Sequence, residues 1–220
     1  MDKAVDARQL YSDKLDAYVR FTAGFLSPQA YQAFFERCEW LRDDMRIMDA
    51  GCGTGVATFA LLDALRRRGF GHREVNAFDL TPAMLSRFEQ RLAQQAIAHV
   101  EIRQADVLKL QSLPADWTDY DLVVSVAMLE YIPGAELASA LAGLRARLAP
   151  DGRLLLVITR KNLITKFLIE KWWQANCYRR SELVTAFEAA GFGKVAFHRF
   201  PYTYFWHNQW AYVIEAGARP

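Results

Sequence analysis

The chain has 220 residues, a formal net charge of +2, and 52% hydrophobic and 24% charged residues, an ordinary globular composition. This length suits one α/β domain with a substantial core. The balanced charge disfavours nucleic acid as a partner, because strong nucleic-acid binders carry a concentrated basic surface. No apolar run reaches the ~20 residues that a membrane-spanning helix needs, and residues 1–20 lack the apolar core of a signal peptide.

The cysteines bear on the cellular setting. Cys38, Cys52 and Cys177 are far apart in the sequence and form neither a CxxC pair nor a disulfide framework. Such usage favours a reducing compartment. We therefore expect a soluble, cytoplasmic protein.

The first elements of the chain are predicted to be helical. Apolar residues recur at helical spacing between residues 10 and 43. Ser27-Pro28 is typical of a helix start, with Ser27 as the N-cap and Pro28 at the first helical position. We expect residues 1–44 to form an N-terminal helical cap.

From Met45 onward, short apolar runs alternate with amphipathic segments. The apolar runs are residues 47–50, 75–78, 100–103, 122–126, 154–158, 195–198 and 211–214. Helices are predicted for residues 55–68, 82–96, 135–149 and 181–190. This alternation predicts an α/β domain over residues 45–220, with a parallel sheet covered by helices on both faces. No clear helix separates the last two runs, which indicates an antiparallel hairpin at one edge of the sheet.

A glycine-rich turn follows the first predicted strand. Residues 49–55 read DAGCGTG and lead directly into a helix. Glycine permits positive φ and a close approach to the backbone, and a helix N-terminus offers unpaired N–H groups. Three alternate glycines after an acidic strand end favour a nucleotide site over a simple turn. A dinucleotide fingerprint would need Gly or Ala at Val56, and the Gly-Lys-Ser/Thr of a P-loop is absent.

This turn resembles the first motif of the class I (Rossmann-like) S-adenosylmethionine-dependent methyltransferases. Further landmarks of that family resemble, in the same order, FDLTPAML (78–85), QADV (104–107), DLVVSVAMLEYI (121–132) and LAPDGRL (148–154). The resemblance covers residues 45–216. It implies a single Rossmann-like three-layer domain, with a mostly parallel seven-stranded sheet, an antiparallel last strand and N-terminal helices. It also implies S-adenosylmethionine as cofactor, with S-adenosylhomocysteine as its product.

The resemblance implies a set of cofactor-binding residues. Asp79 would bind the ribose hydroxyls and Asp106 the adenine amino group, since both follow strand ends where a carboxylate can accept hydrogen bonds. Helix capping is the alternative role of Asp79, although Thr81 is the expected cap. The full set comprises Asp49, Gly51, Gly53, Asp79, Leu80, Met84, Asp106, Val107, Ala127, Tyr11 and Arg20.

The sequence assigns no secure general base and no metal site. Methyl transfer from a sulfonium is a direct displacement that depends mainly on alignment. Where many relatives have a histidine after the fourth strand, this chain has Tyr131. The candidates for a base are therefore Tyr131, His198 and His207, although a lone histidine is more often structural. No cluster of residues has metal-ligand spacing, so we expect no metal.

The acceptor is predicted to be a small molecule. Two aromatic segments, at residues 163–173 and 202–210, bear on its chemical class. The first lies in a predicted substrate-covering insertion around residues 160–180. Either segment fits a hydrophobic or aromatic substrate, a peripheral contact with a membrane or partner, or plain core packing. A protein methyltransferase and a non-catalytic regulator that binds S-adenosylmethionine remain the alternatives, and the oligomeric state is left open.

Overall fold

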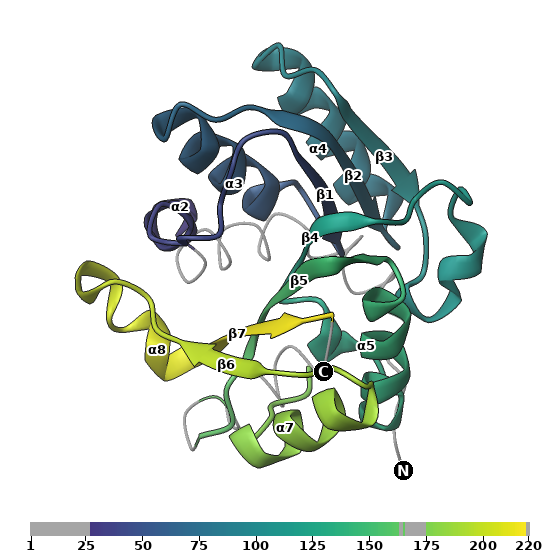
Figure 1. Cartoon of the computed structure of the whole chain (residues 1–220), viewed down its shortest axis with the longest axis vertical. Coiled ribbons are helices and arrows are strands. Elements are labelled where there is room, and N and C mark those ends of the chain that lie inside the picture. Colours follow the sequence, from purple (N-terminus) through teal and green to yellow (C-terminus); the bar gives the residue numbers. More distant parts are fainter. Residues whose placement is uncertain (1–26, 163–164, 166–174, 219–220) are drawn as a thin grey trace.

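A seven-stranded sheet forms the middle layer of the protein. The computed structural model describes residues 27–162, 165 and 175–218. The strand order is β3-β2-β1-β4-β5-β7-β6, and Figure 1 shows helices on both sides of the sheet. The strands are β1 (Met45–Ala50), β2 (His72–Asp79), β3 (Val100–Gln104), β4 (Tyr120–Val126), β5 (Leu148–Thr159), β6 (Val195–His198) and β7 (Ala211–Gly217). The α/β Rossmann-like fold predicted from the sequence is confirmed.

The direction of the strands places the functional edge. Strands β1 to β5 pair in parallel, so their carboxyl ends meet at one edge of the sheet. Strand β7 runs antiparallel to both β5 and β6, which confirms the predicted hairpin at the sheet edge. The order reverses between β1 and β4, the place where open α/β sheets bind ligands.

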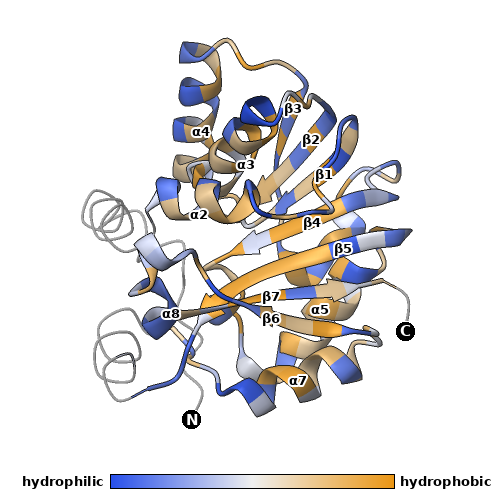
Figure 2. Ribbon diagram, turned by 60° about the vertical axis from the view of Figure 1, so that its left-hand side comes forward, coloured by the Kyte–Doolittle hydropathy of each residue, from blue (hydrophilic) through white to orange (hydrophobic). Residues whose placement is uncertain are grey.

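Two hydrophobic cores hold the three layers together. One core lies under α2 (Pro28–Phe35) and α3 (Val56–Arg67), and α4 (Pro82–Gln94) packs beside it on the same face. The other lies under α5 (Leu137–Arg145) and α7 (Arg180–Ala189). Ile47 of β1 belongs to the first core and Met48 to the second, because successive side chains point to opposite faces. Figure 2 shows the apolar strands between the two helical layers.

The predicted N-terminal helix ends earlier than the periodicity indicates. Helix α2 stops at Phe35, and the predicted helical stretch from there to residue 43 is wrong: Arg37, Cys38 and Leu41 donate backbone hydrogen bonds to carbonyls three residues back, which forms tight turns. Ser27 is the N-cap residue, but its Oγ donates to Gln29 Oε1 at 2.8 Å instead of capping the helix.

Two further boundaries differ from the prediction. The helix expected over 135–149 spans only Leu137–Arg145, because Leu148 already pairs with Tyr120 at the start of β5. Between β6 and β7 the chain forms a 3₁₀ turn, η5 (Tyr202–Tyr204), and a single helical turn, α8 (His207–Trp210). Within the described residues, no helix combines the length and apolar character needed to cross a membrane.

Candidate functional site

The turn between β1 and α3 requires its three glycines. Gly51, Gly53 and Gly55 have φ values of +76°, +52° and +82°, the left-handed region that side chains disfavour. The turn is tied to the neighbouring strand, because the N–H groups of Gly51 and Cys52 both donate to the carbonyl of Phe78, at 2.8 and 3.0 Å. Helix α3 begins at the next residue, so its N-terminus faces the same edge of the sheet.

The surroundings of the three glycines differ. A Cβ on Gly51 would lie 2.2 Å from Cγ of Met128, and a Cβ on Gly55 would lie 2.3 Å from the ring of Phe88. Nothing lies within 4 Å of the Cβ position of Gly53, which lines an open pocket. Gly51 and Gly55 therefore permit close packing, while Gly53 leaves room for a ligand against the backbone.

Asp79 closes the turn from the end of β2. Its Oδ2 accepts a hydrogen bond from the N–H of Gly53 at 2.9 Å, and its Oδ1 accepts one from the N–H of Thr81 at 2.8 Å. The carboxylate also lines the pocket, where it can accept hydrogen bonds from paired hydroxyls. Burial raises the pKa of Asp79, while the two backbone donors oppose that shift. Thr81 is the N-cap residue of α4, but its side chain makes no capping bond.

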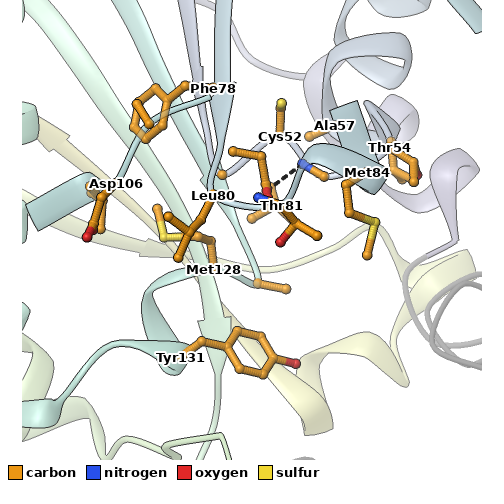
Figure 3. A pocket seen from close by; sticks show the side chains of 18 of the residues that line it. Cys52, Thr54, Ala57, Phe78, Leu80, Thr81, Met84, Asp106, Met128 and Tyr131 are labelled. Carbon is orange, nitrogen blue, oxygen red and sulfur yellow. Dashed lines mark hydrogen bonds between the residues drawn. The ribbon is translucent and has the colours of Figure 1, made fainter. Parts of the chain in front are cut away.

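The pocket collects most of the cofactor residues expected from the sequence. Figure 3 shows its wall, built from the segments that follow β1, β2, β3 and β4. Asp106 caps the 3₁₀ helix η1 (Val107–Ser112) by accepting from Leu108 N at 2.9 Å. Ala127, directly after β4, has a φ of +52°, a strained conformation of the kind found at ligand sites. The expected residues in the wall are Gly51, Gly53, Asp79, Leu80, Met84, Asp106, Val107 and Ala127.

Three expected cofactor residues are not among those that line the described pocket. Asp49 is only 2% exposed and is not among the residues that line the pocket. Its Oδ2 accepts from Thr58 Oγ1 at 2.5 Å, while Oδ1 has no hydrogen-bond partner among the described residues. Burial raises the pKa of Asp49 to about 7. Tyr11 and Arg20 lie outside the described residues.

The three candidate bases lie in different parts of the fold. Tyr131 belongs to the short helix η2 (Leu129–Tyr131) and lines the pocket (Figure 3). His198 lies at the end of the edge strand β6, where its Nε2 is 3.0 Å from Oε2 of Glu215. His207 is 3% exposed and its ring lies 5.2 Å from the rings of both Phe200 and Trp206. The structure therefore brings Tyr131, but neither histidine, into the wall of the pocket.

Sequence reasoning missed a buried carboxyl group beside Tyr131. Glu130 is 3% exposed, and burial raises its pKa to about 7. Its Oε1 accepts from Thr159 Oγ1 at 2.7 Å, and its carbonyl accepts from Asn176 N at 2.8 Å. Glu130 thus ties the pocket wall to the end of β5 and to the chain before α7. A glutamate between two apolar residues, Leu129 and Tyr131, was the available signal.

Other residues complete the wall of the pocket. Met128 and Ile132 follow β4, while Cys52, Thr54 and Phe78 belong to the motifs already described. The described part of the chain holds no group of three or more His, Cys, Asp or Glu side chains that could bind a metal ion. The site therefore offers backbone N–H groups, two carboxylates and an apolar wall.

Comparison with known proteins identifies this arrangement. Residues 47–152 match the family model described as a methyltransferase domain, and the match includes the glycine turn, Asp79 and Asp106. The chain thus contains a class I, S-adenosylmethionine-dependent methyltransferase domain. The match covers the strands β1 to β4 and the helices between them.

Proteins with different names are similar in sequence to the methyltransferase domain. The chain is 30% identical to carboxy-S-adenosyl-L-methionine synthase of Psychrobacter sp. over 149 residues, which are 63% of this chain and 51% of that protein. It is 30% identical to magnesium-protoporphyrin O-methyltransferase of Rhodobacter capsulatus over 144 residues, which are 64% of this chain and 57% of that protein. The matches thus span about half the length of these relatives.

Solved structures share the fold of the methyltransferase domain. Magnesium protoporphyrin IX methyltransferase of Synechocystis, solved with S-adenosylhomocysteine, superposes with a TM-score of 0.68 at 17% identity. That superposition covers 97% of this chain and 98% of the other. At this identity the likeness concerns the fold alone.

Proposed function

We propose that the protein transfers a methyl group from S-adenosylmethionine to a small hydrophobic or aromatic acceptor. The observation that carries this proposal is the pocket at the carboxyl ends of β1 to β4, where the glycine turn, Asp79 and Asp106 converge. The family match over residues 47–152 supports the same reaction.

The residues of the pocket fit S-adenosylmethionine. The open space above Gly53 would take the methionine part of the cofactor against the backbone. Asp79, held in the pocket wall by the N–H groups of Gly53 and Thr81, would accept hydrogen bonds from the ribose hydroxyls. Leu80 and Met84 would form the apolar walls beside the adenine ring, and Asp106 would accept from its amino group. When bound, the cofactor supplies a methyl group on a sulfonium, activated for displacement.

The acceptor side of the pocket is apolar. Met128, Tyr131 and Ile132 line it, and the phenol of Tyr131 is the polar side chain among them. Such a surface excludes water and orients an apolar acceptor, and alignment by itself lowers the barrier of a displacement. An acceptor that is already anionic would need no base, so Tyr131 would act by orienting the acceptor.

Relatives do not define the acceptor. Among them are a malonyl-[acyl-carrier protein] O-methyltransferase of Paenibacillus sp., and, by fold, a geranyl diphosphate C-methyltransferase of Streptomyces coelicolor. One of these proteins is named for methylation of oxygen and the other for methylation of carbon. We propose the cytoplasm as the location, supported by three buried cysteines that form no disulfide among the described residues.

Calorimetric titration tests the cofactor assignment. S-adenosylmethionine and S-adenosylhomocysteine are expected to bind, and NADH is expected not to bind. Asp79→Ala should lose affinity for both sulfur compounds by roughly tenfold or more, because hydrogen bonds to a charged group contribute about 1.5–3 kcal/mol each. The matched control is Asp63→Ala, which removes an exposed carboxylate of α3 paired with Arg66.

Turnover is tested separately with labelled S-adenosylmethionine and a panel of hydrophobic phenols, amines and acids. Label in an acceptor supports the proposed reaction. Tight cofactor binding without transfer to any small molecule would leave a regulator or a protein methyltransferase as the function. Tighter binding of NADH than of S-adenosylhomocysteine would overturn the cofactor assignment itself.

A further inference from the structure

Three large aromatic side chains are exposed together on the loop between β6 and β7. Tyr202, Phe205 and Trp206 are 87%, 56% and 44% exposed, and they are the exposed large hydrophobic residues of the described chain. We call these three residues the aromatic tip. The rings of Tyr202 and Phe205 are stacked 5.8 Å apart, and those of Phe205 and Trp206 are 5.9 Å apart. A contiguous apolar patch of this kind marks an interaction site.

The aromatic tip stands on an ordered base. Phe200 donates its N–H to Oδ1 of Asn208 at 2.8 Å across the loop, and Tyr204 N donates to the carbonyl of Pro201 at 2.8 Å. The base packs against the body of the protein, because the Phe200 ring lies 5.6 Å from Tyr31 of α2. The three exposed rings are therefore held outward by structure in the loop, although burial of apolar surface would favour the opposite.

The loop that carries the aromatic tip has charged side chains of one sign only. Residues 195–214 contain no Asp or Glu. Arg199 is exposed directly before the loop. Arg160, at the end of β5, donates from Nη1 to the carbonyl of Asn208 at 3.2 Å, so a second cation is attached to the base of the loop. The partner of this surface should therefore be apolar and anionic.

We propose that the aromatic tip inserts into the interface of a lipid bilayer that carries anionic headgroups. Figure 1 shows the loop extending beyond the end of β6, so the aromatic tip can reach a lipid layer that lies against this end of the sheet. Tyr and Trp rings settle at headgroup level, and Lys or Arg beside them attract anionic lipid.

The position of the aromatic tip relative to the pocket follows from the pairing of the strands. Thr159 at the end of β5 pairs with Ala211 at the start of β7, and Val126 of β4 pairs with Val157 of β5. The loop therefore lies at the same edge of the sheet as the pocket. A docked protein would turn this edge toward the lipid, from which an apolar acceptor could enter. Lipid binding itself does not depend on the proposed methyl transfer.

Co-sedimentation with vesicles tests the proposal on the full chain. One set of vesicles is phosphatidylcholine, and in the other about a third of the lipid is phosphatidylglycerol. The protein should sediment with the anionic vesicles, and added salt should release it. The triple variant Tyr202→Ser, Phe205→Ser, Trp206→Ser should lose roughly tenfold or more in apparent affinity, because it removes the apolar part of the contact.

Charge variants supply the matched control. Arg199→Glu reverses a charge next to the aromatic tip and should lower binding to anionic vesicles by roughly tenfold. Lys194→Glu makes the same reversal of charge directly before β6, at the end of that strand away from the loop, and should bind like wild type. Retained calorimetric binding of S-adenosylhomocysteine shows that each variant is folded.

Three results would overturn the proposal. The first is failure of the wild type to sediment with anionic vesicles. The second is equal sedimentation of the wild type and the triple variant. The third is a dimer that the triple variant abolishes while vesicle binding is absent, because the aromatic tip would then be a contact between two copies of the chain.

Discussion

The contact between Gly51 and Met128 allows a quantitative test of how the pocket is built. Gly51→Ala would place a methyl carbon 2.5 Å from Cβ and 2.2 Å from Cγ of Met128, whereas carbon atoms pack at about 3.5–4.0 Å. Rotation of the Met128 side chain moves Cγ but leaves Cβ in place. The backbone after β4 must therefore shift, and this backbone forms the acceptor side of the pocket.

The expected loss of stability has two parts. Ala at the left-handed φ of Gly51 costs about 1–2 kcal/mol, and overpacking costs typically about 1–3 kcal/mol. Gly51→Ala should thus lower the free energy of unfolding by roughly 2–5 kcal/mol. Gly69→Ala isolates the first part, because Gly69 has a φ of +75° and nothing lies within 4 Å of its Cβ position.

The free energy of unfolding of both variants is measured by urea denaturation, which is monitored by tryptophan fluorescence. Gly51→Ala should unfold at clearly lower urea than Gly69→Ala and should bind S-adenosylhomocysteine more weakly. Adding Met128→Gly, which removes both colliding atoms, should restore part of the loss in a double-mutant cycle. Equal midpoints for Gly51→Ala and Gly69→Ala, or an additive double variant, would refute the close-packing argument.

Three more predictions concern buried groups. Burial raises the pKa of Glu130 from 4.5 to about 7, so the native state keeps a proton that the unfolded chain releases, and stability falls as pH rises through this window. Glu130→Gln should reduce the difference in unfolding free energy between about pH 5 and pH 8 by up to roughly 3 kcal/mol. If this difference is unchanged, the raised pKa of Glu130 is not the cause of the pH dependence. Tyr120→Phe leaves Oδ1 of buried Asn76 without its donor at 2.8 Å and should cost about 1–3 kcal/mol, visible as a lower urea midpoint unless Asn76 finds another partner. Burial raises the thiol pKa of Cys38 to about 12 and that of Cys52 as well, so a thiol reagent should label the native protein far more slowly than the unfolded one.

The central strands β1, β2, β4 and β5 were predictable because they are largely buried on both faces. Parallel strands of this kind appear as continuous apolar runs, and every run identified in the sequence lies within a strand. The predicted bounds of helices and strands are wrong where the local sequence pattern and the tertiary contacts favour different structures. Residues 36–43 keep helical spacing but fold into turns, and residues 148–149 join β5 because Leu148 pairs with Tyr120.

The cofactor side of the pocket was predictable for a different reason. Its residues follow directly after strands, in contiguous motifs whose chemistry can be recognised locally. The motif alone did not indicate that Asp49 is buried behind the turn, because its hydrogen-bond donor is Thr58 of α3. Glu130 could not be identified in this way, because Thr159 and Asn176 lie far from it in the sequence.

The acceptor side depends on contacts of another kind. Glycines with positive φ and carboxylates at strand ends specify the cofactor side of the pocket. These features would hold the cofactor, so they do not depend on which acceptor is used. The opposite wall is formed by the side chains of Met128, Tyr131 and Ile132, which follow β4. The shape of this wall therefore depends on the side chains after β4 and not on the glycine turn or the strand-end carboxylates. A screen for the acceptor should accordingly vary the size and polarity of the molecule against Tyr131 variants, and should include acceptors dissolved in lipid vesicles.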